Sequence, residues 1–97
     1  MAAKQLPVPQ GADHANGTEV LRAFIVNGGL EVALQRAFET PDVWGILLAD
    51  IARHASRIFA RETQISERDA LDTICELFDK EMARPTDLGI TKEERGH

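Results

Sequence analysis

The chain has 97 residues, of which 43% are hydrophobic and 28% are charged, and it carries a formal net charge of -5. This length allows one domain with one core, and the composition excludes an intrinsically disordered chain. The acidic balance argues against a dedicated nucleic-acid binder, because binding to phosphates depends on clustered Lys and Arg.

Cys75 is the only cysteine, so no disulfide can form within the chain and nothing indicates an oxidising compartment. The N-terminal residues lack the apolar segment of a secretory signal. The longest apolar run, residues 43–49, is far shorter than the roughly 20 residues of a membrane-spanning helix. We therefore expect a cytoplasmic protein without a membrane partner.

Residues 1–17 contain two prolines and two glycines among small polar residues. Proline fixes an extended backbone and glycine loosens it, so this segment is predicted to form an extended N-terminal arm. Leu6 and Val8 could hold the arm against the body or against a partner, and the alternative is a mobile terminus.

Residues 20–26 and 30–35 are rich in strand-forming side chains and flank the turn sequence Asn27-Gly28-Gly29, which predicts a β-hairpin. The loop could be Asn27-Gly28 or Gly28-Gly29. The first register brings six apolar side chains to one face, whereas the second pairs Leu21 with Arg36 on that face. Burial favours the first register. Its facing pairs are Ile25 with Leu30, Ala23 with Val32, and Leu21 with Leu34.

Apolar residues recur at three- and four-residue steps between Thr40 and Thr63, which predicts a long amphipathic helix. Thr40 is expected to cap this helix, and Pro41 suits the first helical position. Asp42 suits the positive end of the helix dipole. The apolar stripe consists of Trp44, Leu47, Leu48, Ile51, Ala55, Ile58 and Phe59.

A second helix is predicted from Ser66, which forms a capping-box pattern with Asp69, to about Arg84, where Pro85 ends it. Because the connection is short, the two helices should form an antiparallel pair. Cys75 falls in the apolar stripe, so we expect a buried and unreactive thiol. Residues 86–97 are predicted to be a flexible tail. The other members of this stripe are Leu71, Ile74, Phe78 and Met82.

These elements predict an α+β fold of order ββαα, with the antiparallel hairpin packed on the helix pair in one domain over residues 18–85. The other face of the hairpin is only half polar and its edges are open, so we expect homodimerisation to extend the sheet. Two hairpins could pair edge to edge, or pack face to face through Phe24 and Val26. Trp44 is a further interface candidate, and the alternative is a core ring that closes the hairpin end of the domain.

A second face of the long helix carries ionisable side chains. Asp50 and His54 lie one turn apart, so the carboxylate could orient the imidazole or begin a metal site. No third ligand joins them, so we predict no metal and favour a pair on the helix surface, in which Asp50 contacts either His54 or an arginine. No motif of a nucleophile, a phosphate loop or a cofactor site occurs, so no catalytic residue and no cofactor are predicted. The ligand-binding candidates are Asp50, Arg53, His54 and Arg57.

Arg53, Arg57 and Arg61 form a basic edge that could hold phosphate or carboxylate groups of a ligand or of a nucleic acid. The second helix carries an acidic row at similar steps, which could pair with this edge within the chain or across a dimer. We favour this structural pairing, because an acidic row in the same domain requires no other partner. The acidic row is Asp69, Asp72, Glu76 and Asp79.

Four segments occur in a recognisable order: Leu-Pro-Val-Pro near the start, Glu-Val-Leu-Arg-Ala from Glu19, Asn-Gly-Gly-Leu from Asn27, and Trp-Gly-Ile-Leu-Leu-Ala-Asp-Ile-Ala-Arg-His from Trp44 to His54. Over roughly residues 5–88 the chain resembles a bacterial family of short domains of unknown function, about 100 residues long. The resemblance implies a single-domain protein of the bacterial cytoplasm, and it implies no activity, ligand or catalytic residue.

The sequence favours a homodimeric interaction or regulatory module over an enzyme. The alternative is a small-ligand-binding protein or an enzyme that uses the face with Asp50, His54 and Arg57. The biological process, the ligand and the geometry of the dimer are left open.

Overall fold

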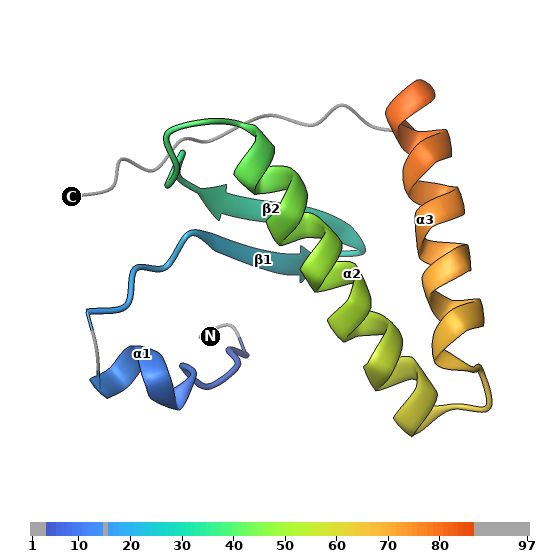
Figure 1. Cartoon of the computed structure of the whole chain (residues 1–97), viewed down its shortest axis with the longest axis horizontal. Helices are drawn as coiled ribbons and strands as arrows, with labels where there is room; N and C mark the ends of the chain where they lie inside the picture. Colours follow the sequence, from blue (N-terminus) through green and yellow to red (C-terminus); the bar gives the residue numbers. More distant parts are fainter. Residues whose placement is uncertain (1–3, 15, 87–97) are drawn as a thin grey trace. The chain divides into compact units, whose positions relative to one another are not determined.

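The computed structural model describes residues 4–14 and 16–86 of the chain. The chain divides into two compact units, of which the first holds a short helix and two strands, and the second, beginning at Phe38, holds two long helices (Figure 1). In chain order the elements are α1 (Gln10–His14), β1 (Leu21–Val26), β2 (Gly29–Leu34), α2 (Asp42–Glu62) and α3 (Glu67–Ala83). The predicted α+β class is confirmed.

The N-terminal arm contains α1, which the sequence analysis did not predict. It is a single helical turn of five residues, and the amide of Ala12 donates a hydrogen bond of 3.0 Å to the carbonyl of Pro9. Proline is common at the start of helices because its missing N–H is not needed there. Residues 1–3 and 15 of the predicted arm, and residues 87–97 of the predicted tail, lie outside the described residues.

The β-hairpin has the register that burial favoured. Ile25 pairs with Leu30 and Leu21 pairs with Leu34 in an antiparallel ladder. Asn27 and Gly28 have φ angles of 52° and 81°, so both adopt the left-handed conformation that a two-residue type I′ turn requires. The choice between the two loops is therefore confirmed as Asn27-Gly28.

The apolar face of the hairpin is covered at one end only. Leu21, Val32 and Leu34 are half-buried, whereas Ile25 and Leu30 next to the turn are 73% and 68% exposed. Burial on this face is therefore confined to the end of the hairpin away from the turn, and Ala23 in the middle of β1 is exposed as well.

The predicted cap of the first long helix is wrong and that of the second is confirmed. Pro41 occupies the capping position of α2, and the hydroxyl of Thr40 donates a hydrogen bond to the carboxylate of Asp42 instead of accepting one from the backbone. In α3 the Ser66 hydroxyl accepts a hydrogen bond of 3.1 Å from the amide of Asp69. This bond satisfies one of the unpaired N–H groups at the start of the helix.

Helices α2 and α3 run antiparallel, and they separate with distance from the short loop that joins them (Figure 1). Ser56 of α2 is fully buried and Ala70 of α3 is 5% exposed. The hydroxyl of Ser56 donates a hydrogen bond of 2.8 Å to the carbonyl of Ala52 one turn earlier, so no polar group is left unpaired there. Because both side chains are small, the two helices can approach closely.

The outer half of α3 is exposed, in contrast to the predicted buried stripe. Phe78 is 50% and Met82 is 71% exposed, and Cys75 is exposed as well. The prediction of a buried thiol is wrong because Cys75 lies about 140° around α3 from the buried Ala70, away from the side that faces α2. None of the helices in the described part of the chain is long and apolar enough to cross a membrane.

The buried position of Ser56 can be tested by substitution. Ser56→Leu should lower the free energy of unfolding by about 1–3 kcal/mol, because extra methylene groups in a close contact force the helices apart. Ser56→Ala should change it by less than about 0.5 kcal/mol, since it removes only a local hydrogen bond and favours the helix. Urea unfolding followed by circular dichroism measures both. Equal stability of the Leu variant and the parent protein would contradict the close contact.

Candidate functional site

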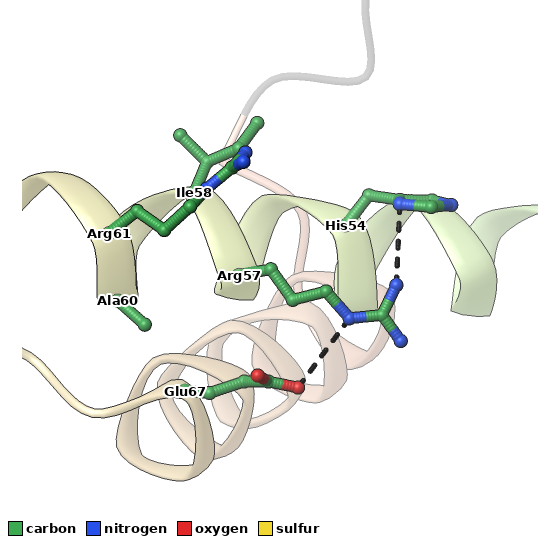
Figure 2. A pocket seen from close by; sticks show the side chains of 6 residues that line it. All are labelled: His54, Arg57, Ile58, Ala60, Arg61 and Glu67. Atoms are coloured by element: carbon green, nitrogen blue, oxygen red, sulfur yellow. Dashed lines mark hydrogen bonds and ion pairs between the residues drawn. The ribbon is translucent and has the colours of Figure 1, made fainter.

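The ligand-binding candidates all lie exposed on α2, but the structure brings together only two of them. His54 and Arg57 line an open pocket of about 510 Å³, whereas Asp50 and Arg53 do not line it (Figure 2). Helix α3 contributes one side chain, Glu67. The other lining residues, all from α2, are Ile58, Ala60 and Arg61.

Arg57 is the centre of the polar contacts in this pocket. Its Nη1 atom lies 3.5 Å from Nδ1 of His54, and its Nε atom lies 3.7 Å from Oε2 of Glu67 (Figure 2). The predicted surface pair of Asp50, with His54 or with an arginine, does not form, because Asp50 makes no hydrogen bond or ion pair with another described residue. The imidazole therefore faces a guanidinium instead of a carboxylate.

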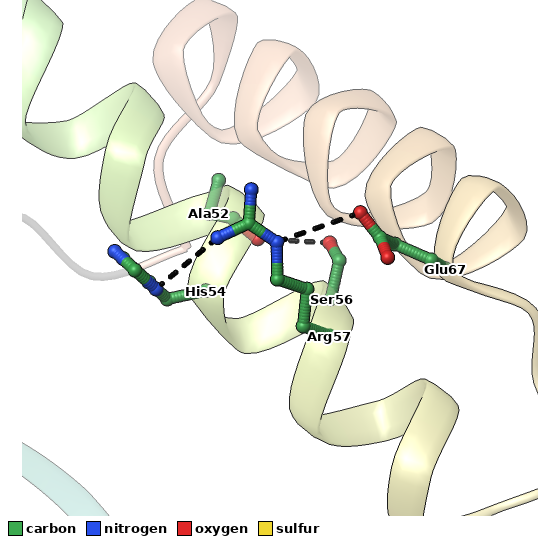
Figure 3. A network of polar contacts seen from close by, with 5 residues as sticks. All are labelled: Ala52, His54, Ser56, Arg57 and Glu67. Atoms are coloured by element: carbon green, nitrogen blue, oxygen red, sulfur yellow. Dashed lines mark hydrogen bonds and ion pairs between the residues drawn. The ribbon is translucent and has the colours of Figure 1, made fainter.

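Two serine side chains help to bring Glu67 opposite Arg57. Ser66 caps α3, so Glu67 is its first helical residue and its negative charge lies at the positive end of the helix dipole. The small, buried Ser56 lets α3 approach α2 beside Arg57 (Figure 3). The ion pair thus depends on the helix cap and on the close contact between the helices.

The predicted pairing of the basic edge with the acidic row is wrong within the chain. In the described part of the chain, the ion pair between Arg57 and Glu67 is the only one that joins α2 to α3, and Glu67 does not belong to the acidic row. Asp72 lies about 160° around α3 from the buried Ala70, so the row points away from α2. Glu76 instead pairs with Lys80 at 3.2 Å within α3.

The pocket carries one positive charge in excess. Glu67 balances one of the two arginines, and Arg61 makes no hydrogen bond or ion pair with another described residue. A guanidinium offers planar donors that suit a carboxylate or a phosphate. The described residues contain no group of three His, Cys, Asp or Glu side chains that could hold a metal ion.

The interface candidates lie in both units. Trp44 is half-buried, and its ring meets that of Phe38 edge to face with centroids 5.9 Å apart. The guanidinium of Arg22 lies 5.5 Å from the centre of the half-buried Phe24 ring. Val26, next to the turn, is exposed. Two of the three candidates therefore already have aromatic or cationic neighbours within the chain.

Sequence reasoning found His54, Arg57 and Arg61 but missed Glu67 as their neighbour. Glu67 directly follows the recognised cap Ser66, so its carboxylate lies in the first turn of α3. In an antiparallel pair this turn is opposite the last turns of the preceding helix, and this placement could have identified Glu67. Ile58 was assigned to the apolar stripe, although it also lines the pocket.

The fold and the site define a small α+β domain with an antiparallel hairpin, a helix pair and a weakly basic surface pocket. The chain belongs to the family described as the domain of unknown function DUF5076, whose model matches residues 5–86. It is 47% identical to a protein with a solved structure, described as a "putative pyruvate dehydrogenase" from the photosynthetic bacterium Rhodopseudomonas palustrus CGA009. That match covers 97% of this chain and 98% of the other, with a TM-score of 0.79. A search of curated proteins found no match.

The ion pair between Arg57 and Glu67 should contribute little to stability. Both side chains are about half exposed, and exposed pairs of this kind contribute about 0.2–1 kcal/mol. In a double-mutant cycle of Arg57→Ala and Glu67→Ala, we expect a coupling free energy below about 1 kcal/mol that falls further in high salt. Urea unfolding of the four proteins measures it. A larger coupling that persists in salt would show a buried, structural pair.

Proposed function

We propose that this protein is a homodimeric interaction module of the bacterial cytoplasm, without catalytic activity of its own. One observation carries the proposal: among the described residues, Ala70 is the only buried hydrophobic residue. Large apolar side chains of α2 and α3 remain 41–71% exposed, namely Ile46, Leu48, Ile51, Ile58, Phe59, Leu77, Phe78 and Met82.

This exposure is large in energetic terms. Full burial of one large apolar side chain stabilises a protein by about 1.5–3 kcal/mol. Covering the exposed half of these side chains would therefore contribute on the order of 10 kcal/mol, which is comparable with the total stability of a small domain. Such a surface is typical of a chain that folds together with a partner.

A second copy of this chain is present wherever the protein is made, so it is always available as a partner. Two-fold dimers are also the commonest assemblies of soluble proteins. The hairpin supports the same proposal, because both of its strands are edges and Phe24 and Val26 lie on its half-polar face. The bacterial setting is supported by the source of the protein with the solved structure, and the cytoplasm by the single cysteine.

The proposal does not include the enzyme activity in the name of the protein with the solved structure. Decarboxylation of a 2-oxo acid leaves a carbanion, which requires a cofactor that acts as an electron sink. The only chemistry-bearing groups around the described pocket are His54, Arg57, Arg61 and Glu67, on an open surface that does not exclude water. These residues do not fit such a cofactor.

Sedimentation equilibrium at micromolar concentration tests the proposed dimer. The chain mass is 10.7 kDa, and we expect twice this value, with the sedimenting mass falling on dilution. A mass of one chain at every concentration up to about 100 μM would refute the proposal.

The pocket favours a second candidate function, the binding of a small anion. This candidate uses His54 and Arg57 with Arg61, rather than Asp50 and Arg53, because only the former line the pocket. Arg61 has a guanidinium that no described residue neutralises, and the neighbouring Ile58 could contact an apolar part of the ligand.

Inorganic phosphate and citrate are suitable probes of this second candidate. At low ionic strength they should raise the melting temperature of the protein if the pocket binds anions, because a ligand that binds the folded state stabilises it. The variant Arg57→Ala/Arg61→Ala should lose this effect, whereas Arg68→Ala, which removes an exposed arginine outside the pocket, should keep it. Equal shifts in all three proteins would dismiss a specific site.

A further inference from the structure

The exposed side of α2 carries a continuous apolar surface, which we call the α2 stripe: Leu47, Leu48, Ile51, Ala55, Ile58 and Phe59. Four of these residues are 41–46% exposed, and Leu47 and Ala55 are half-buried. The ionisable residues between positions 47 and 59, which are Asp50, Arg53, His54 and Arg57, lie outside the stripe, on other parts of the helix circumference. The surface therefore suits an uncharged, apolar partner.

Helix α3 does not cover the α2 stripe. The residue of α2 that is buried against α3 is Ser56, which lies about 140° around the helix from Ile51. The stripe and the contact with α3 are thus different sides of one helix. Its exposure follows from the packing of the helix pair, which uses the small residues of α2 and leaves the large ones outward.

The α2 stripe has the same spacing when it is read from either end. Leu47 and Leu48 mirror Phe59 and Ile58 about position 53, and Ile51 mirrors Ala55. If two copies of α2 lie antiparallel and cross at position 53, each residue of the α2 stripe of one copy meets an apolar residue of the α2 stripe of the other. At the centre a large Ile51 meets a small Ala55, which allows the two helices to approach closely.

We propose that the second copy of this chain docks on the α2 stripe, with the two α2 helices antiparallel and related by a two-fold axis. This inference rests on the proposed dimer and names its contact surface. Each copy carries a net charge of -5, so two copies repel at long range, and a contact without charged residues avoids adding to that repulsion. The symmetric spacing makes one patch complementary to itself, as a two-fold interface requires.

Substitutions on two sides of α2 test which surface is used. Ile51→Glu and Ile58→Glu introduce a buried charge without a partner, and each should raise the dimer dissociation constant at least about 100-fold. Ile46→Glu is the matched control, because Ile46 is more exposed, at 61%, and lies about 140° around the helix from Ile51 on the side away from the stripe. This control should dimerise like the parent protein.

A reciprocal pair of variants tests the antiparallel arrangement. Leu48 of one copy should face Ile58 of the other, so Leu48→Glu and Ile58→Lys should each weaken their own homodimer. An equimolar mixture should form a heterodimer, in which Glu and Lys meet at one end and the native pair remains at the other. Sedimentation of the mixture measures this recovery. If a single variant loses its helical circular dichroism on dissociation, recovery of helicity on mixing is read out instead.

The outcomes separate this inference from the proposed function. A parent protein that sediments as one chain refutes both the proposed dimer and the α2 contact. The α2 stripe would then be covered by the same chain or remain in solvent. A dimer that Ile46→Glu disrupts and Ile51→Glu does not would preserve the proposed function and overturn the α2 contact. A dimer that the stripe variants disrupt but that mixing does not restore would overturn the antiparallel arrangement.

Discussion

The packing of the helix pair centres on its two small buried side chains, Ser56 of α2 and Ala70 of α3. Small side chains let the two backbones approach each other. The Ser56 hydroxyl donates a hydrogen bond to the carbonyl of Ala52, so it is not left unpaired. The contact fixes which side of each helix is internal. The large apolar side chains of each helix therefore lie beside these two residues or on the opposite side of the helix.

The same contact determines the polar surface. Because α3 meets α2 at Ser56, the first residue of α3 comes opposite the adjacent Arg57, and Glu67 forms the single described ion pair between the helices. The acidic row of α3 is turned the other way and remains in solvent. The pocket with His54 is therefore a product of the helix packing and of the cap at Ser66.

The features that sequence predicted well are set by local chemistry. Asn27 and Gly28 tolerate positive φ angles, which decided the hairpin register, and Ser66 supplies a hydroxyl at the right distance before α3. The wrong predictions concern the sides of the helices. A period of 3.6 residues locates the apolar side of a helix. The side of α2 that is buried against α3 carries the polar Ser56, so the apolar pattern did not identify it. The burial of Cys75 and the pairing of the acidic row both depended on that side.

The exposure of Cys75 on α3 has a consequence for the chemistry of the isolated protein. A chain with one thiol can form a disulfide only with another molecule, and an exposed thiol is open to oxidation. In an oxidising buffer two copies can therefore become linked covalently through α3, whatever surfaces they use when reduced. Reducing agent distinguishes such a linked pair from a dimer held by apolar contacts.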